Sequence, residues 1–454
     1  MAWAGQSAHP GISDRQKRQL HHIATMTKSS SDLEKQPDHS TDQTTDVEPS
    51  VEAAAELSPA PDGGRVAWLV AVGACCTSFA GLGFANSTGI FIEYYLSHQL
   101  QDKTPDDVAW IGSLSNFIQF ASGCIGGPLF DRYGAWVIRP AAILYLLAIM
   151  MTSLCHEYWQ FMLAQGVLLG IGMGGLMFPA LAAVSQWFDK KRAAALGLTI
   201  SGSSIGGVVI PIIFSKLLND SSLGFGWSVR VVGFVMMPFL LFSCVFIKAR
   251  LPPKVSSFFD GSAFKQTEFC LLAGAMFFMM LGVFTPLFYI PTLAVSRGMN
   301  ATLASYLLAI INGASIFGRI IPGVLADKLG PSNVFSVAGI VTGVIVCCLD
   351  EPSGTAQFVV YCVFIGFCSG TVISGGSAAL ARTVKNPQLM GTYLGMGMGL
   401  SSIAVLIGPP INGRLLDQYG FLSVGLFSGL VCLVGGALAL LSKVFSPHGL
   451  ISKF

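Results

Sequence analysis

Charged residues are scarce in this chain. Asp, Glu, Lys and Arg together make up 11% of its 454 residues, whereas roughly a quarter of the residues in a soluble domain are charged. Hydrophobic residues make up 52%, and the mean hydropathy is +0.64. So few charges over such a length exclude a water-soluble fold and predict a protein that lies in a lipid bilayer.

Several functional signals are also missing. The net charge of +2 comes without a basic cluster of the size that nucleic acid binding requires. No Gly-x-x-x-x-Gly-Lys-Ser/Thr loop is present, which argues against an ATP-driven pump. The 11 cysteines lie in or beside apolar runs without metal-like spacing, so we interpret them as small buried residues. We therefore expect no metal, no cofactor and no nucleic acid partner.

Two motifs that suggest enzymes stand in the wrong context. Gly170, Gly172 and Gly175 spell a dinucleotide fingerprint, and residues 202–206 spell a nucleophile elbow. The first requires a preceding strand and the second a strand-turn-helix, but both lie in apolar runs of membrane-helix length, so we expect no enzyme. Small residues four apart let membrane helices approach closely, and they occur at Gly166, Gly170 and Gly174 and at Gly366, Gly370 and Ser374.

A polar turn recurs between the apolar runs. Residues 127–134 and 323–330 share both glycines, a leucine and an aspartate at a distance of 196 residues. Residues 413–420 carry the pattern again, and residues 215–219 are a weaker echo. Recurrence at this distance predicts a duplicated membrane protein in which each half contains two inverted three-span units.

Apolar runs long enough to cross a bilayer, about 20 residues each, alternate with short polar connectors from Val66 onward. Helices are the only suitable element, because an open sheet edge in lipid leaves backbone groups unpaired. We predict an all-α membrane protein with twelve transmembrane helices in two pseudosymmetric six-helix bundles. The expected spans are 66–92, 108–130, 137–155, 158–186, 193–218, 227–249, 267–292, 301–326, 332–350, 356–381, 388–414 and 420–444.

The segments outside the spans are polar. Residues 1–60 are nearly free of large apolar side chains and predict a disordered cytosolic tail. The tail holds no apolar core of signal-peptide length, so we expect the first span to start membrane insertion. The predicted bundles cover 61–249 and 267–445, with a cytosolic linker at 250–266 and a cytosolic C-terminal tail at 446–454.

Lysine and arginine are divided unequally between the connectors. If the first tail is cytosolic, the connectors on its side hold twelve of them and the others hold five, so the positive-inside rule places both termini in the cytosol. We expect the plasma membrane, with a vacuolar membrane as the alternative. Asn219 and Asn300 begin glycosylation patterns in outer connectors. We predict carbohydrate there, with Asn300 the preferred acceptor, and none at Asn86 inside span 1.

The acid and the base of the repeated turn stand at a helix end, where they can bind backbone groups and residues of neighbouring helices. We predict a charged latch that holds the cytosolic face shut and then releases, formed by Asp131 with Arg132 and by Asp327 with Lys328. The alternative for the two bases is a plain positive-inside anchor.

Polar side chains form matching stripes in spans 2 and 8. The shift of 196 residues superposes Asn116, Gln119 and Gly123 on Asn312, Ser315 and Arg319. Positions spaced in this way lie on one face of a helix, so we predict that the two stripes face each other across a central substrate cavity. The alternative is that the amides only join helices by hydrogen bonds, worth about 0.6 kcal/mol each.

The chain from Pro61 onward resembles the major facilitator superfamily, whose two six-helix bundles carry the repeated turn after spans 2 and 8. Residues 61–68, Pro-Asp-Gly-Gly-Arg-Val-Ala-Trp, resemble the signature of the monocarboxylate porter family, and residues 86–91 are similar to its fungal branch. The resemblance implies a secondary transporter for a short organic acid, a vitamin or a secondary metabolite, which works by rocking its halves around a central site.

The resemblance also bears on coupling. In animal members of the porter family, span 8 carries an acid four residues before an arginine and span 1 carries a lysine, which together serve the proton and the carboxylate. This chain keeps the arginine as Arg319, but Ser315 stands in place of the acid and Asn86 in place of the lysine. A co-transported proton is therefore left open.

Arg319 is the only charged residue well inside a span. It lies eight residues before Asp327, about 12 Å along the helix, and a cation at this depth costs about 2.5 kcal/mol or more unless something compensates. Since the family's acid is absent, we predict an anionic substrate as its counter-charge. The alternative is an arginine tied to helix-end carbonyls and span 2 as part of the inner gate.

The leading hypothesis is a plasma-membrane transporter that moves a small organic anion, such as a monocarboxylate or an acidic secondary metabolite, by alternating access. Uptake and export are both open. The alternatives are export of a neutral secondary metabolite, vitamin transport and, from another class, a transport-incompetent sensor or scaffold. The expected partners are the small-molecule substrate and the lipid bilayer.

Overall fold

The computed structural model of the protein describes residues 60–219, 222–252 and 260–445. These residues belong to one compact unit, and every regular element in them is a helix. The predicted disordered tail before residue 60 lies outside the described residues, as do residues 253–259 of the predicted linker and the predicted C-terminal tail. The exact bounds of the two bundles therefore stay a prediction.

The first half crosses the membrane six times, and several crossings are built from more than one helix. Its elements are α2 (Gly64–Ala85), α3 (Thr88–Ser97), α4 (Pro105–Ala121), α5 (Gly123–Tyr133), η2 (Gly134–Val137), α6 (Ile138–Thr152), α7 (Tyr158–Phe161), η3 (Met162–Leu168), α8 (Leu169–Trp187), α9 (Arg192–Asn219) and α10 (Gly224–Phe246). The crossing that contains α7 and α8 is continuous through η3, which is a π-helix.

The second half repeats this plan. Its elements are η4 (Ala263–Lys265), α11 (Thr267–Val283), α12 (Thr285–Ser296), α13 (Ala301–Leu329), α14 (Pro331–Cys347), α15 (Thr355–Arg382), η5 (Pro387–Leu389) and α16 (Met390–Val444). The last helix holds two crossings that meet at Gly420, where the backbone leaves helical geometry. The break between α2 and α3 in the first crossing is matched by the break between α11 and α12 in the seventh.

The predicted all-α membrane fold of twelve crossings is confirmed. Among the described residues, nine helical segments are long and apolar enough to span a membrane, and α14 is a shorter apolar helix. Two of the nine, Asp107–Thr152 and Pro387–Val444, have 46 and 58 residues. A crossing needs about 20 residues, so each of these two segments crosses twice.

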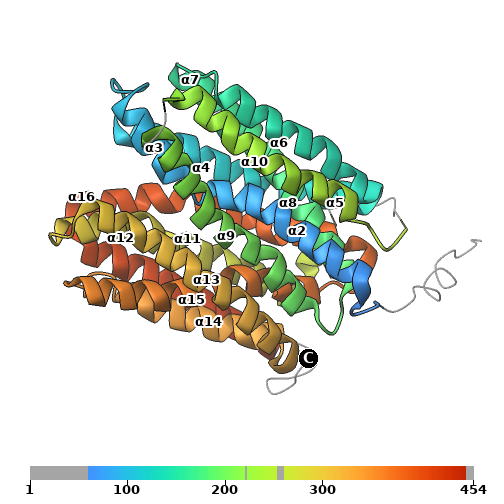
Figure 1. Ribbon diagram of the computed structural model, residues 1–454. Helices are drawn as coiled ribbons and strands as arrows, with labels where there is room; N and C mark the ends of the chain where they lie inside the picture. Colours follow the sequence, from blue (N-terminus) through green and yellow to red (C-terminus); the bar gives the residue numbers. More distant parts are fainter. Residues whose placement is uncertain (1–59, 220–221, 253–259, 446–454) are drawn as a thin grey trace, which may run out of the picture. The chain divides into compact units, whose positions relative to one another are not determined.

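The helices of each half of the chain lie together in space. Figure 1 shows the blue-to-green helices of the first half in the upper part of the view and the yellow-to-red helices of the second half mostly in the lower part. Two junctions make the most extensive contacts between the halves: α13 packs along α9, and α16 packs along the crossing formed by α4 and α5. At both junctions, a helix with the repeated turn at its end packs against a helix of the other half.

The last glycine of the repeated turn explains why the pattern recurs. Gly134, Gly330 and Gly420 have φ angles of 64°, 95° and 79°, which side chains with a Cβ rarely adopt. At each copy this glycine lets the chain leave one crossing and begin the next.

Small residues bring helices together inside each half, as their spacing predicts. A Cβ added at Gly174 of α8 would lie 2.5 Å from the carbonyl oxygen of Gln119 on α4. A Cβ added at Gly370 of α15 would lie 2.7 Å from the carbonyl oxygen of Ser315 on α13. The same close approach therefore fixes the polar faces of α4 and α13 in corresponding places.

Candidate functional site

The acid of the first turn binds the other half of the molecule. The carboxylate of Asp131 accepts hydrogen bonds from the main-chain N–H groups of Gly391 and Thr392, at 3.0 and 2.6 Å, and from the Thr392 hydroxyl at 2.7 Å. These groups stand at the start of α16, where a helix leaves N–H groups unpaired and its dipole favours an anion. Asp131 is only 3% exposed, so water competes little for these bonds.

The acid of the second turn makes the corresponding contact in the opposite direction. The carboxylate of Asp327 accepts hydrogen bonds from the main-chain N–H groups of Ala193 and Ala194, at 2.8 and 3.0 Å, at the start of α9. We call the Asp131 and Asp327 contacts the acid clasps, and the end of the molecule that carries them the clasp end. Each half thus holds the other by one aspartate.

The bases of the two turns take no part in the clasps. Arg132 and Lys328 are exposed, and the Arg132 guanidinium lies 5.6 Å from the centroid of the Tyr133 ring. Neither forms an ion pair in the described part of the chain. The acids therefore bind main-chain groups of the opposite half, whereas the two bases are exposed; a latch that opens and closes stays a prediction.

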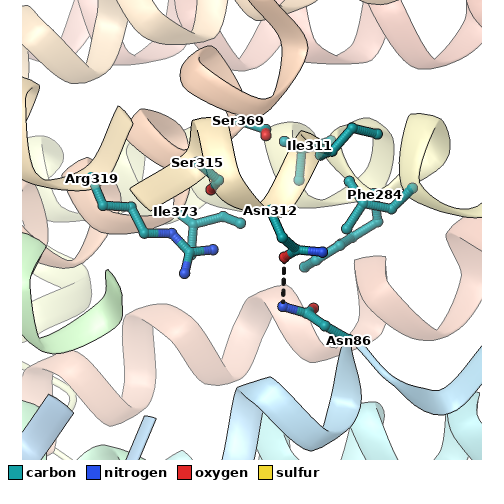
Figure 2. A pocket seen from close by; sticks show the side chains of 10 residues that line it. Asn86, Phe284, Ile311, Asn312, Ser315, Arg319, Ser369 and Ile373 are labelled. Atoms are coloured by element: carbon teal, nitrogen blue, oxygen red, sulfur yellow. Dashed lines mark hydrogen bonds between the residues drawn. The ribbon is translucent and has the colours of Figure 1, made fainter. Parts of the chain in front are cut away.

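A small pocket, partly open to solvent, lies between the halves, and its space of about 290 Å³ between atoms includes open solvent. Its lining combines the breaks in the first and seventh crossings with the polar stripe of α13 (Figure 2). The lining residues are Asn86, Val283, Phe284, Leu287, Ile311, Asn312, Ser315, Arg319, Ser369 and Ile373.

Two asparagines connect the halves at this pocket. The Asn86 side-chain Nδ2 donates to Asn312 Oδ1 at 3.4 Å, and it also lies 3.4 Å from the Ser203 carbonyl oxygen. The amide of Asn312 donates in turn to the Leu308 carbonyl at 3.0 Å. Figure 2 shows the Asn86–Asn312 bond crossing from the blue ribbon of the first half to α13.

Arg319 lies deeper at the same pocket and is only 4% exposed. Its Nη1 donates to the Ile200 carbonyl oxygen at 2.7 Å and to the Ser203 hydroxyl. Both partners belong to α9 of the first half, so the predicted alternative of a tie to span 2 is wrong. Among the described residues, no carboxylate pairs with Arg319, and its buried Nε has no hydrogen-bond partner.

The stripe of the first half does not face the stripe of α13, contrary to prediction. Neither Asn116 nor Gln119 lines the pocket. Gln119 is fully buried and its Nε2 lies 3.7 Å from the sulfur of Met177. Met173 and Met177 stand 196 residues before Ser369 and Ile373 of the pocket lining. Methionine side chains therefore fill the space in the first half that corresponds to the pocket in the second.

Two contact residues escaped the sequence reasoning. Ser203 attracted notice only as part of a false nucleophile motif, although its hydroxyl accepts a hydrogen bond from Arg319. Asp62 lay in the segment that resembles the porter signature. Its carboxylate accepts hydrogen bonds from the main-chain N–H groups of Asp189, Lys190 and Lys191 at 2.6, 2.7 and 3.3 Å, which holds the turn before α9.

The glycosylation predictions stay open. Asn300 is exposed just before α13, whereas Asn86 lies in the pocket. The side chain of Asn219 lies outside the described residues. In the described ranges, no group of His, Cys, Asp and Glu side chains could hold a metal ion.

Two six-helix bundles with a polar pocket at their junction are the architecture of a membrane transporter. The chain belongs to the Major Facilitator Superfamily, whose family model matches residues 73–349 and 270–451. It is a multi-pass membrane transporter and not an enzyme.

Individual relatives refine this placement. The chain is 49% identical to the aspyridones efflux protein of Emericella nidulans, over 87% of this chain and 81% of that protein. It is 38% identical to the agnestins efflux protein of Paecilomyces divaricatus, over 90% of this chain and 94% of that one. Among solved structures, it is similar to a human organic anion transporter with a TM-score of 0.66 and 15% identity, covering 83% and 99% of the two chains. At that identity the likeness shows the fold alone.

Proposed function

We propose that this protein exports a small organic anion, an acidic secondary metabolite, across the plasma membrane by alternating access. The observation that carries the proposal is Arg319, a buried cation at the pocket with no carboxylate partner among the described residues. A guanidinium forms two parallel hydrogen bonds with a carboxylate, and its buried Nε is free of protein partners in the described chain. Export is supported by two relatives that are named as efflux proteins.

The substrate site in this proposal has a polar side and an apolar side. Arg319 holds the acidic group, while Asn86, Asn312 and Ser315 offer hydrogen bonds around it. Phe284 and Leu287, among other lining residues, supply apolar contact. Asn116 and Gln119 contribute only if the first half repacks, because Gln119 is fully buried here.

Alternating access requires a closure that can release, and we assign it to the acid clasps. Asp131 and Asp327 bind main-chain N–H groups of the opposite half, so both bonds break when the halves separate at the clasp end. The distribution of Lys and Arg supports a cytosolic position for this end. In this scheme the exposed Arg132 and Lys328 act as anchors at the membrane surface.

Placement in the monocarboxylate porter family stays a narrower proposal, supported by residues 61–68 and 86–91. Proton coupling by the groups that animal porters use is excluded at two positions. Ser315 and Asn86 carry no group that titrates in the physiological range. Any coupled proton must therefore use other residues.

The test is transport by purified protein in liposomes. The aspyridones for which a relative is named serve as one cargo, and an aryl carboxylate with its uncharged methyl ester serves as a matched pair. We expect Arg319→Ala to abolish binding and transport of the carboxylate and Arg319→Lys to weaken both, because lysine keeps the charge but loses the planar fork. Arg414→Ala removes the same side chain from an exposed position and should change nothing.

Other outcomes discriminate between functions. Unchanged carboxylate affinity in Arg319→Ala would contradict the anion site. Equal transport of acid and ester by the unmodified protein would indicate export of a neutral metabolite. Absence of any flux would favour a sensor or scaffold.

A further inference from the structure

Helix α13 contacts α9 through two charged side chains, and the backbones of the two helices approach closely between them. Asp327 binds the start of α9, and Arg319, eight residues earlier in α13, binds Ile200 and Ser203. Between these points, a Cβ added at Gly323 would lie 2.9 Å from the Ala193 carbonyl oxygen. The pair α9–α13 therefore joins the halves over about two helical turns, with one tie at the clasp end and one at the pocket.

In the corresponding pair on the other side of the molecule, α5 and α16, the clasp is joined in the described residues only by a weak contact from the Cys124 thiol to the Gly395 carbonyl oxygen, at 3.7 Å, and not by a second charged tie. There Asp131 binds the start of α16, but Gly123 stands at the position that corresponds to Arg319. Gly123 contacts the α16 backbone at Gly395 without a side chain. Only the α9–α13 junction thus carries a tie that also lines the substrate pocket.

The partners of Arg319 on α9 are weak ones for a buried cation. A carbonyl and a hydroxyl are neutral acceptors that leave the positive charge uncompensated, whereas a carboxylate supplies the opposite charge and can accept two parallel hydrogen bonds. Both bonds also use Nη1, which leaves Nε unpaired in the described structure. A carboxylate arriving in the pocket would therefore be a better partner than α9 for the same guanidinium.

We propose that the anionic substrate and α9 compete for Arg319. Substrate binding takes the guanidinium from Ile200 and Ser203, which removes the polar tie at the pocket and leaves Asp327 and the close backbone contact to hold the α9–α13 junction. This inference rests on the proposed anion site at Arg319 and adds to it a means by which occupancy loosens one junction between the halves. Ser203 is then a positioning residue, which holds the arginine against α9 and lowers the apparent affinity for the substrate.

Linkage makes the competition measurable. A ligand shifts a conformational equilibrium only by its preference for one state, and that preference works in both directions. Removing the Ser203 hydroxyl should therefore tighten anion binding, on the order of tenfold for one hydrogen bond to a charged group. A bound anion should likewise separate the clasp ends of α9 and α13.

The first experiment measures the dissociation constant of the aryl carboxylate for purified full-length protein. We expect tighter binding to Ser203→Ala and unchanged binding to Ser203→Thr, which keeps a hydroxyl. Ser204→Ala is the matched control, because Ser204 is a buried neighbour on α9 whose hydroxyl has no partner among the described residues. The Ser204→Ala variant should bind the carboxylate with the same affinity as the unmodified protein.

The second experiment uses protein that retains Ser203, so its result does not depend on whether Ser203→Ala folds correctly. Spin labels at Lys190→Cys and Lys328→Cys report the separation of α9 and α13 at exposed positions of the clasp end. We expect the carboxylate to populate longer distances and the methyl ester to leave the distribution unchanged.

The outcomes separate the two proposals. Unchanged or weaker carboxylate binding to Ser203→Ala, with binding still lost in Arg319→Ala, would overturn the competition and leave the anion site in place. A distance distribution that ignores the carboxylate would overturn it as well. Normal carboxylate binding to Arg319→Ala would overturn both the competition and the proposed function.

Discussion

Replacing Asp131 by asparagine should open the clasp end without disturbing the fold of either half. The carboxylate accepts three hydrogen bonds from Gly391 and Thr392 across the junction of the halves. The amide of asparagine keeps one acceptor oxygen and turns the other into a donor. One of the N–H groups at the start of α16 then faces another donor and loses its partner.

The size of the effect follows from these contacts. A hydrogen bond to a charged group is worth about 1.5–3 kcal/mol, and the lost charge at a helix N-terminus adds up to about 1 kcal/mol. The lower cost of burying a neutral amide offsets part of this loss. A net change of about 2 kcal/mol corresponds to roughly a 30-fold shift in the ratio of closed to open molecules.

Distances between labels on the two halves measure that ratio. Tyr133 and Lys385 are exposed residues of opposite halves and can carry spin labels after replacement by cysteine. The background should lack Cys124 and Cys348, the two native cysteines that are exposed. We expect Asp131→Asn to raise the fraction of long distances and to slow the return to the closed form.

The third copy of the turn supplies the control. Asp417 is exposed, so Asp417→Asn makes the same chemical change away from any clasp and should leave the distances as they are. A closed population as large in Asp131→Asn as in the unmodified protein would refute the reasoning, because it would mean that the three bonds contribute nothing to closure.

Two further predictions concern packing. Gly127→Val should hold the clasp end open, because a Cβ at Gly127 collides with the Gly391 backbone. Gly413→Val should be tolerated, since the atom nearest to a Cβ there is the Tyr289 hydroxyl oxygen at 3.8 Å. The spin labels at positions 133 and 385 measure both variants, and a closed Gly127→Val protein would contradict the prediction. Asn412→Leu should lower the thermal unfolding midpoint of the purified protein, because Asn412 bonds to Thr285 and Ser428 in a buried triangle and each unsatisfied group costs about 1–3 kcal/mol. Adding Thr285→Val and Ser428→Ala should restore most of the loss, and a triple variant as unstable as the single one would argue against the network.

The crossings and the duplication could be predicted because both appear as patterns in the order of residues along the chain. Apolar runs of bilayer length mark the helices, and the turn at 127–134 returns at 323–330. The last glycine of each copy takes a positive φ. The glycine by which the repeat is recognised in the sequence is therefore one that the backbone of the turn requires. The acids of the turn could be placed at helix ends for the same reason, although their main-chain partners could not be named.

The site could be predicted only in part, because symmetry of the backbone does not extend to the side chains. The shift of 196 residues identified Asn312, Ser315 and Arg319, which line the pocket. The same shift predicted a pocket position for Gln119 wrongly, since the Gln119 side chain lies against Met177 instead. The partners of Arg319, Ile200 and Ser203, lie 119 and 116 residues away on a helix of the other half, and no pattern in the sequence of α9 indicates these contacts.

The main-chain character of the acid clasps has a consequence for how such proteins diversify. Asp131 and Asp327 bind N–H groups that every residue except proline supplies, so much of the surface opposite each acid can change in sequence, apart from Gly391, where a Cβ would meet the Gly127 backbone, and Thr392, whose hydroxyl also binds Asp131. Halves from two different relatives should therefore dock at this end as long as each keeps its aspartate. New cargo preferences can arise by exchange of a whole half, while the closing contact is inherited unchanged.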